Sequence, residues 1–230
     1  MVKYNTLGVN MNKEEITLRL NEPLFEIYYN YLIDENEKLN LTAITQRDDV
    51  YSKHFYDSVM IMTYLPFKRK KVLDIGAGAG FPSIPIKMIE PSVDLTIVDG
   101  LKKRIDFLNR LTQKLEIEVQ CVHGRAEALQ QWSTYDVILA RAVGRLNVLV
   151  EMALPYLRMN GYFVAYKSIH YQEELKDAQK AIALLGGKVE KVVEYALNDE
   201  LKHVYILIKK VKKTPKGYPR HFSKIKKKPL

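Results

Sequence analysis

The chain has little cysteine and no long apolar run, and both absences exclude classes of protein. Cys121 is the single cysteine among 230 residues, so the chain can form no internal disulfide and no thiol-rich metal site. No apolar stretch approaches the length of a membrane-spanning helix, and residues 1–15 lack the apolar centre of a signal peptide. We therefore expect a soluble cytoplasmic protein that binds neither a metal nor a membrane.

Acidic residues are missing from the C-terminal end of the chain. Residues 209–230 contain nine lysines and Arg220 but no acid, so they more than account for the net charge of +9. Aromatic residues lie among these cations, which suits contacts with the phosphates and unpaired bases of a nucleic acid. A solvated, disordered tail that only favours solubility is the alternative. Pro215 and Pro219 predict that no helix forms there.

A glycine-rich segment, DIGAGAGFP, occupies residues 74–82. The apolar run 71–75 is typical of a buried parallel strand, and the proline at the end of the segment suits the first turn of a helix. Gly76, Gly78 and Gly80 permit positive φ at a sharp turn and leave the backbone bare, so that a ligand can approach it closely. The segment therefore predicts a nucleotide-binding turn, with a purely structural strand-to-helix turn as the alternative.

The spacing of the glycines in this segment narrows the choice of ligand. A dinucleotide pattern G-x-G-x-x-G needs a glycine where Phe81 stands, and no Lys-Ser/Thr pair of a phosphate-binding loop is present. The pattern D-x-G-x-G-x-G resembles motif I of the S-adenosylmethionine-dependent methyltransferases. Asp99 ends the next apolar run, about twenty residues further on, where such folds bind the hydroxyls of a ribose.

Apolar periodicity predicts the arrangement of helices and strands. Helices are expected at 23–39 and 48–64, in the N-terminal part. From residue 71 onward, strand-like runs alternate with amphipathic helices. The expected strands are 71–75, 94–99, 117–122, 135–140, 161–167, 189–195 and 203–209. The expected helices are 82–90, 102–115, 144–157 and 171–185.

This alternation predicts an α/β fold with a mostly parallel seven-stranded sheet and helices on both faces. We assign residues 1–66 to an N-terminal helical extension, 67–210 to the sheet domain and 211–230 to a basic tail. Ligands of such sheets bind at the carboxyl ends of the strands, so polar residues at those ends are the candidates for a site.

Charged residues follow three further strands of the expected sheet. Glu127 suits a contact in an adenosine pocket or, alternatively, the first turn of a helix. Arg141 suits a fork that holds a carboxylate or an RNA phosphate, with a surface ion pair as the alternative. For Lys167 a functional role and an ordinary lysine at a solvent-exposed edge are equally open.

Several blocks of sequence resemble one family over nearly the whole chain. They are NEKLNLTAIT (36–45), KHFYDSV (53–59), DIGAGAGFPSIPIK (74–87), TIVDGLKKRIDFL (96–108), RAE (125–127), ARAVGRL (140–146), LPYLRMNGYFVAYK (154–167) and TPKGYPR (214–220). The chain resembles the bacterial 16S ribosomal RNA guanine-N7 methyltransferases called RsmG, earlier GidB. The motif-I glycines are common to many methyltransferases, whereas the NLT, HFYDS and TPKxYPR blocks are much more specific.

The resemblance implies a Rossmann-like class I methyltransferase that uses S-adenosyl-L-methionine and methylates N7 of one guanine in 16S ribosomal RNA. It implies 16S RNA or the small ribosomal subunit as partner, and we expect a monomer. The cofactor contacts implied by the resemblance are Gly76, Gly78, Gly80, Phe81, Asp99, Ala126, Glu127 and Arg141. A methyltransferase for a protein or small molecule, and an RNA-binding protein with a vestigial cofactor fold, are the alternatives.

Methyl transfer to guanine N7 needs alignment more than proton transfer. N7 carries a lone pair and no proton, so no general base is needed. Neither the Asp/Asn-Pro-Pro-Tyr/Phe motif of exocyclic-amine methylases nor the Pro-Cys nucleophile of cytosine-C5 enzymes is present. The candidates for stabilising the positive charge of the product are His54, Tyr56 and Asp57, with Lys167 as a further catalytic candidate. His54 and Asp57 could equally belong to a helix face that packs on the catalytic domain.

The target guanine has to expose its N7 edge, so the expected substrate is unpaired or flipped RNA. The basic clusters at 68–71 and 102–104, together with the tail, are expected to hold the surrounding phosphates. Deleting 209–230, or cutting at 213, is expected to weaken RNA methylation while cofactor affinity stays nearly intact.

Overall fold

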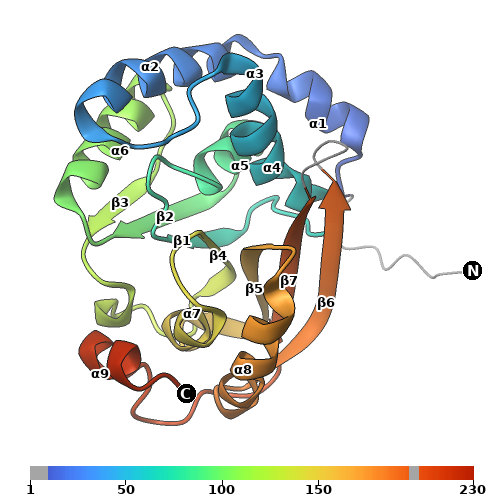
Figure 1. Ribbon diagram of the computed structural model, residues 1–230, viewed down its shortest axis with the longest axis vertical. Coiled ribbons are helices and arrows are strands. Elements are labelled where there is room, and N and C mark those ends of the chain that lie inside the picture. The colour runs from blue at the N-terminus through green and yellow to red at the C-terminus, as the bar shows by residue number, and fades with distance from the viewer. Residues whose placement is uncertain (1–9, 197–201) are drawn as a thin grey trace, which may run out of the picture.

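The computed structural model describes residues 10–196 and 202–230, which form one seven-stranded sheet with helices on both faces (Figure 1). The order of the strands is β3-β2-β1-β4-β5-β7-β6. Their bounds are β1 Lys71–Ile75, β2 Asp94–Asp99, β3 Gln120–His123, β4 Tyr135–Arg141, β5 Leu157–Ser168, β6 Gly187–Ala196 and β7 Lys202–Lys210. The expected seven strands are thus confirmed.

Strands β1 to β5 pair in parallel, and β7 enters antiparallel between β5 and β6. Ile75 lies opposite Val98, and Asp99 lies opposite His123, so β1, β2 and β3 end near one line. The chain reverses its order at β1, where β4 pairs on the other side. A ligand crevice forms at such a reversal because the loops after the two central strands diverge.

The helices fall into two layers, one on each face of the sheet (Figure 1). The first layer contains α1 Lys13–Leu20, α2 Pro23–Leu39, α3 Arg47–Val50, α4 Asp57–Val59, α5 Ser83–Ile89 and α6 Lys102–Lys114. The second contains α7 Leu146–Ala153, α8 Tyr171–Leu184 and α9 Phe222–Lys227. Three short segments complete the set: the π-helix η1 Tyr51–Tyr56 and the 3-10 helices η2 Met60–Thr63 and η3 Ala126–Ala128.

Successive side chains of each strand point to opposite faces of the sheet, so the apolar core is divided between the two helix layers. In β1, Val72 packs with the N-terminal helices, whereas Leu73 packs with α7 and α8. Phe25 and Phe55, from α2 and η1, are buried in the same cluster as Val72. The N-terminal helices therefore share their core with the sheet and cover one of its faces.

Most expected elements are confirmed, three expectations need correction, and one N-terminal helix was not expected. The helix expected at 144–157 spans only Leu146–Ala153, and β5 already begins at Leu157. The helix expected at 48–64 is a chain of four shorter helical pieces, because a π turn interrupts the α-helical spacing at Tyr51–Tyr56. The strand expected at 117–122 begins only at Gln120. The helix Lys13–Leu20 was not anticipated, although Asn12 and Glu15 form a capping box at its start.

The C-terminal end is ordered and contains a helix, so the expectation from its prolines is wrong. Pro219 precedes α9, and His221 accepts a hydrogen bond from Ser223 N at the helix start. Ile225 is fully buried in the cluster under α7. Arg220 forms an ion pair with the buried Glu151 of α7. None of the helices in the described part of the chain combines the length and apolar character needed to cross a bilayer.

Candidate functional site

Two cavities open at the carboxyl edge of the parallel strands, and both are lined by Ala142, which directly follows β4. The first cavity, about 280 Å³ in volume, is lined by Gly76, Asp99 and Ala126 among others, and we name it the glycine cavity. The second, about 550 Å³, is the histidine cavity. Its lining includes His54, Asp57, Arg141, Lys167 and His203.

The three glycines after β1 have positive φ angles but serve different purposes. A β-carbon at Gly80 would lie 2.6 Å from the hydroxyl of Tyr28, so this glycine lets α2 pack on the turn. A β-carbon at Gly76 would lie 2.8 Å from a methyl of Val143. At Gly78, with φ of 60°, a β-carbon would meet nothing within 4 Å. Gly78 is therefore the glycine that leaves open backbone at the turn.

Asp99 is buried at the end of β2 and is held in place by the backbone. Its Oδ1 accepts a hydrogen bond from Leu101 N at 2.9 Å, and its Oδ2 accepts one from Gly78 N at 3.3 Å. Arg104 Nη1 lies 3.5 Å from Oδ2. Each carboxylate oxygen has a second lone pair, so the side chain is oriented and still able to accept a bond from a ligand. Together with Gly76 and Ala126, it lines the glycine cavity and places an acid beside its backbone.

Five residues expected at the cofactor do not line the glycine cavity, and one of them, Arg141, lines the histidine cavity instead. The five are Gly78, Gly80, Phe81, Glu127 and Arg141. Phe81 is buried, and its ring stacks on His54 with ring centroids 4.6 Å apart and on Tyr28 at 5.4 Å. Phe81 thus supports the floor beneath the histidine cavity. Glu127 lies in η3 next to Ala126, and its Oε2 is buried without a hydrogen-bond partner among the described residues.

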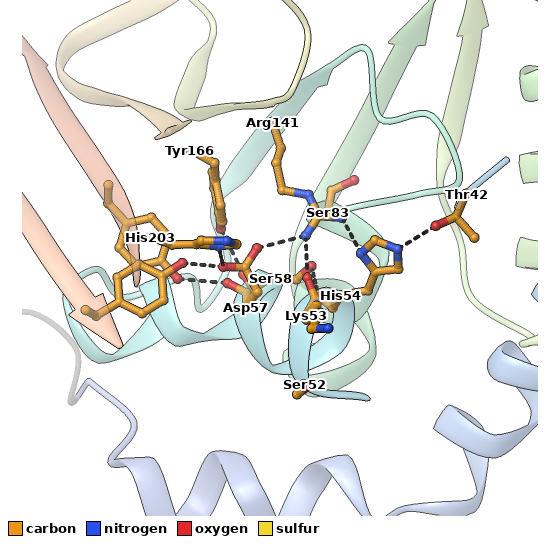
Figure 2. Close-up of polar contacts among 12 residues, drawn as sticks. Thr42, Ser52, Lys53, His54, Asp57, Ser58, Ser83, Arg141, Tyr166 and His203 are labelled. Atoms are coloured by element: carbon orange, nitrogen blue, oxygen red, sulfur yellow. Dashed lines mark hydrogen bonds and ion pairs between the residues drawn. The ribbon is translucent and has the colours of Figure 1, made fainter. Parts of the chain in front are cut away.

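Asp57 is the most heavily bonded acid of the site. Its side chain is 1% exposed, and it accepts hydrogen bonds from Arg141 Nη1 at 2.8 Å and from His203 Nδ1 at 2.6 Å (Figure 2). It accepts a third hydrogen bond from the Tyr195 hydroxyl. Burial alone would raise the pKa of Asp57, but the hydrogen bond from His203 and the charge of Arg141 outweigh it and hold the pKa below its usual value. The carboxylate is ionised and already compensated.

His54 continues this network on the other side of Arg141. Nη2 of Arg141 lies 3.2 Å from His54 Nδ1, and His54 Nε2 lies 2.8 Å from the hydroxyl of Thr42 (Figure 2). Because a guanidinium only donates, Nδ1 is the acceptor and the proton sits on Nε2. Burial, reinforced by the charge of Arg141, lowers the pKa of His54 to about 4. At neutral pH the imidazole is therefore uncharged.

Tyrosines of the sheet anchor the helical segment that carries these two residues. The hydroxyl of Tyr205 donates to Asp57 O at 2.8 Å, and that of Tyr166 donates to Ser58 O at 2.8 Å. The π turn shifts the residues that follow it around the helix axis. In this arrangement both His54 and Asp57 reach Arg141.

Lys167 is bonded to the loop that separates the two cavities. Its ammonium donates to Gly144 O at 2.7 Å and pairs with Glu174 Oε2 at 2.6 Å. Glu174 also accepts from Leu146 N, at the start of α7. Lys167 thus lines the histidine cavity while it fixes the loop after Arg141. No group of three or more possible metal ligands occurs among residues 10–196 and 202–230.

The structure adds residues that the sequence did not suggest. Thr42, Tyr166, Tyr195 and His203 contact the network around Asp57 or line the histidine cavity. Thr42 belongs to the NLT block, which supported the family resemblance but did not indicate what Thr42 does. Tyr195 and His203 lie on β6 and β7, whose sequences predict only strands.

Comparisons of sequence identify the relatives of this chain. The family model described as rRNA small subunit methyltransferase G (GidB) matches residues 21–204. A protein of Lactococcus lactis subsp. cremoris named ribosomal RNA small subunit methyltransferase G is 50% identical over 204 residues, which are 85% of each chain. The protein of that name from Bacillus subtilis is 44% identical over 91% of this chain and 95% of its own length.

Solved structures with a similar fold share little sequence with this chain. A methyltransferase from Pyrococcus furiosus superposes with a TM-score of 0.60 at 14% identity, over 82% of this chain and 98% of its own. The TYW2 protein of M. jannaschii, solved in complex with AdoMet, gives a TM-score of 0.59 at 12% identity, over 74% and 80%. These similarities establish the Rossmann-like α/β fold.

Proposed function

Since this chain belongs to the rRNA small subunit methyltransferase G family and hence methylates RNA of the small ribosomal subunit, we propose that its methyl donor is S-adenosylmethionine and its acceptor is N7 of a guanine in 16S RNA. The observation that carries the proposal is the contact of the two cavities at Ala142. One cavity has the features of a nucleoside site, and the other is large enough for a base. A donor and an acceptor bound on either side of Ala142 would face each other.

The glycine cavity is the proposed cofactor site. Asp99 would bind the ribose hydroxyls, and the adenosyl end would lie against the backbone at Gly76, beside Val143, with the open backbone of Gly78 next to it. Ala126 would lie beside the adenine, with the unpartnered Glu127 carboxylate oxygen as a further acceptor nearby. When bound, S-adenosylmethionine supplies an activated methyl group on its sulfonium.

The histidine cavity is the proposed guanine site. Guanine N7 carries no proton, so the chain only has to orient the base and exclude water. A neutral His54 does not repel the positive charge that the base acquires on methylation. We assign Asp57 a positioning role, because it holds Arg141 at the junction of the cavities, where the remaining guanidinium donors can contact a carboxylate or a phosphate.

The remaining expectations follow from the substrate. An enzyme for ribosomal RNA acts where ribosomes are assembled, so we propose a cytoplasmic protein. We also propose that it acts as a monomer. Sedimentation of the protein alone and with small subunits tests this assignment.

Transfer of a tritium-labelled methyl group tests the proposed function. The purified chain and labelled S-adenosylmethionine are incubated with small subunits from a strain that lacks this protein, and the modified nucleotide is mapped by mass. We expect one 7-methylguanine in 16S RNA. Label found in protein or in metabolites would show that the methyl acceptor is not RNA. RNA binding without cofactor binding in calorimetry would indicate an RNA-binding protein with a vestigial cofactor fold.

Asp99→Ala tests the cofactor site in the same assay. Loss of a charge-assisted bond to the ribose is expected to raise the Kd for the cofactor at least tenfold. Asp106→Asn is the matched control, because Asp106 pairs with Lys102 on the exposed side of α6 and lines neither cavity. An unchanged Kd in Asp99→Ala would remove the glycine cavity from the proposal.

A further inference from the structure

A third cavity, of about 570 Å³, lies at the opposite edge of the sheet from the candidate site. Trp132 and Ser133 precede β4, and Leu157 and Met159 lie at the beginning of β5. The segment from Lys213 to Tyr218 forms the other wall. Strand β4 runs from beside this cavity to its last residue, Arg141, a span of about 20 Å.

Trp132 presents an aromatic surface in this cavity. One face of the indole stacks on Tyr156, with ring centroids 5.1 Å apart and an angle of 23° between the planes. The residue nevertheless remains 46% exposed, and the neighbouring Met159 is 44% exposed. Tyr218 contributes a second aromatic side chain to the lining. Large apolar side chains at this exposure are typical of binding surfaces when they gather in a concave site.

The charges of this cavity are all positive. Lys213 and Lys216 line it and are exposed, and no acid is among the lining residues. Lys210, also in the lining, is buried and donates to Leu154 O and Leu185 O, so it serves the fold. The exposed lysines are therefore the ones available to an anionic ligand.

We propose that this cavity binds an unpaired nucleotide of the ribosomal RNA at a distance from the methylated guanine. The base stacks in the aromatic site at Trp132, and Lys213 and Lys216 contact the flanking phosphates. Aromatic stacking combined with cations is the usual way to hold single-stranded nucleic acid. The inference rests on the proposed RNA substrate, which is long enough to reach both edges of the sheet.

Trp132 is the single tryptophan of the chain, so its fluorescence reports on this cavity alone. In the full-length protein, a single-stranded 16S RNA fragment is expected to quench this emission, because the base stacks on the indole. The same fragment annealed into a duplex and S-adenosylhomocysteine are expected to leave the emission unchanged. An unquenched Trp132 under conditions where filter binding shows that the RNA is bound would overturn the inference.

Charge reversal distinguishes RNA binding in this cavity from nonspecific electrostatic attraction of RNA to the protein. Lys213→Glu combined with Lys216→Glu is expected to weaken quenching by the RNA at least tenfold and to reduce the salt dependence of binding, by about 0.7 in log-log slope for each lost phosphate contact. Lys176→Glu combined with Lys180→Glu, on the exposed side of α8, changes the net charge equally and lines none of the three cavities. An equal loss in this control pair contradicts the assignment.

Trp132→Ala is expected to raise the KM for RNA about tenfold while the Kd for the cofactor stays unchanged, and Trp132→Phe is expected to restore much of the loss. Normal methylation of RNA with an unquenched Trp132 refutes this inference but leaves the proposed function intact. Absence of RNA methylation in the unaltered protein refutes the proposed function first. If intact small subunits quench the emission but their naked RNA does not, the ligand of this cavity is a ribosomal protein. That result would contradict the proposal that the cavity binds a nucleotide.

Discussion

Arg141 donates a hydrogen bond from Nη1 to Oδ2 of Asp57 at 2.8 Å, which joins the end of β4 to α4 across 84 positions of sequence. The carboxylate is buried, and the guanidinium side chain is 16% exposed. A pair of this kind adds little net stability, but the loss of one partner leaves a desolvated charge behind. The pair therefore fixes Arg141 at the junction of the two cavities.

The first prediction concerns this pair. Asp57→Ala is expected to lower the free energy of unfolding by about 3 kcal/mol, because it leaves the charge of Arg141 without compensation and removes the acceptor of Tyr195 and His203. Urea denaturation measures the change. Glu26→Gln, which breaks the exposed pair of Glu26 with Arg47, is the control and should have a far smaller effect. Equal losses would contradict a special role for Asp57.

The strands were predictable from the sequence because apolar runs of five to seven residues encode buried strands directly. The position of Asp99 beside the glycine turn was predictable because the turn and the acid lie close together in sequence. The network around Asp57 was not, since His203 is 146 positions away and nothing in a strand pattern indicates where a side chain will find an acid. The sequence suggested that Arg141 holds a carboxylate or an RNA phosphate, or else forms a surface ion pair. In the structure its partly buried guanidinium contacts Asp57 and His54.

The second prediction is a pH dependence that arises from His54. Its pKa is about 4 in the folded protein against an ordinary value of 6.5, so the unfolded chain binds a proton first as the pH falls. The contribution of His54 to stability is present above pH 6.5 and is lost as the pH approaches 4, with a total of about 3 kcal/mol.

Free energies of unfolding at pH 7.0 and pH 4.5 measure this effect. His54→Gln cannot titrate, so its stability should fall less over this interval than that of the unaltered protein. Because other groups titrate in both proteins, the difference between the two slopes is the informative quantity. Identical slopes would show that His54 is not held neutral by burial and Arg141.

The third prediction separates two glycines of the same turn. Gly80→Ala is expected to lower the melting temperature by several degrees, because its methyl would approach the Tyr28 hydroxyl and Ile84 in a backbone with φ of 104°. Gly78→Ala meets no neighbouring atom and has φ of 60°, so it should cost only about 1 kcal/mol of stability. Calorimetry with S-adenosylmethionine should show weakened binding for Gly78→Ala, since its methyl would occupy the open backbone. Unchanged affinity would move the ligand away from Gly78.

The fourth prediction concerns the C-terminal segment, whose order changes the experiment suggested by the sequence. Deleting 213–230 would remove Ile225, which is fully buried, and would leave Glu151 of α7 without Arg220. Such a truncation should lower stability, and its effect on RNA methylation would mix unfolding with lost contacts. The deletion therefore cannot measure RNA binding by itself.

Point substitutions separate the two effects. Ile225→Ala is expected to lower the free energy of unfolding by about 3 kcal/mol because it leaves a cavity under α7. Reversal of the exposed Lys224, Lys226 and Lys227 to glutamate should leave the melting temperature nearly unchanged, yet raise the KM for RNA and flatten its salt dependence. If the lysine variant instead methylates RNA with an unaltered KM and salt slope, the exposed side of α9 contributes nothing to substrate binding, and this helix serves only to cover the core beneath α7.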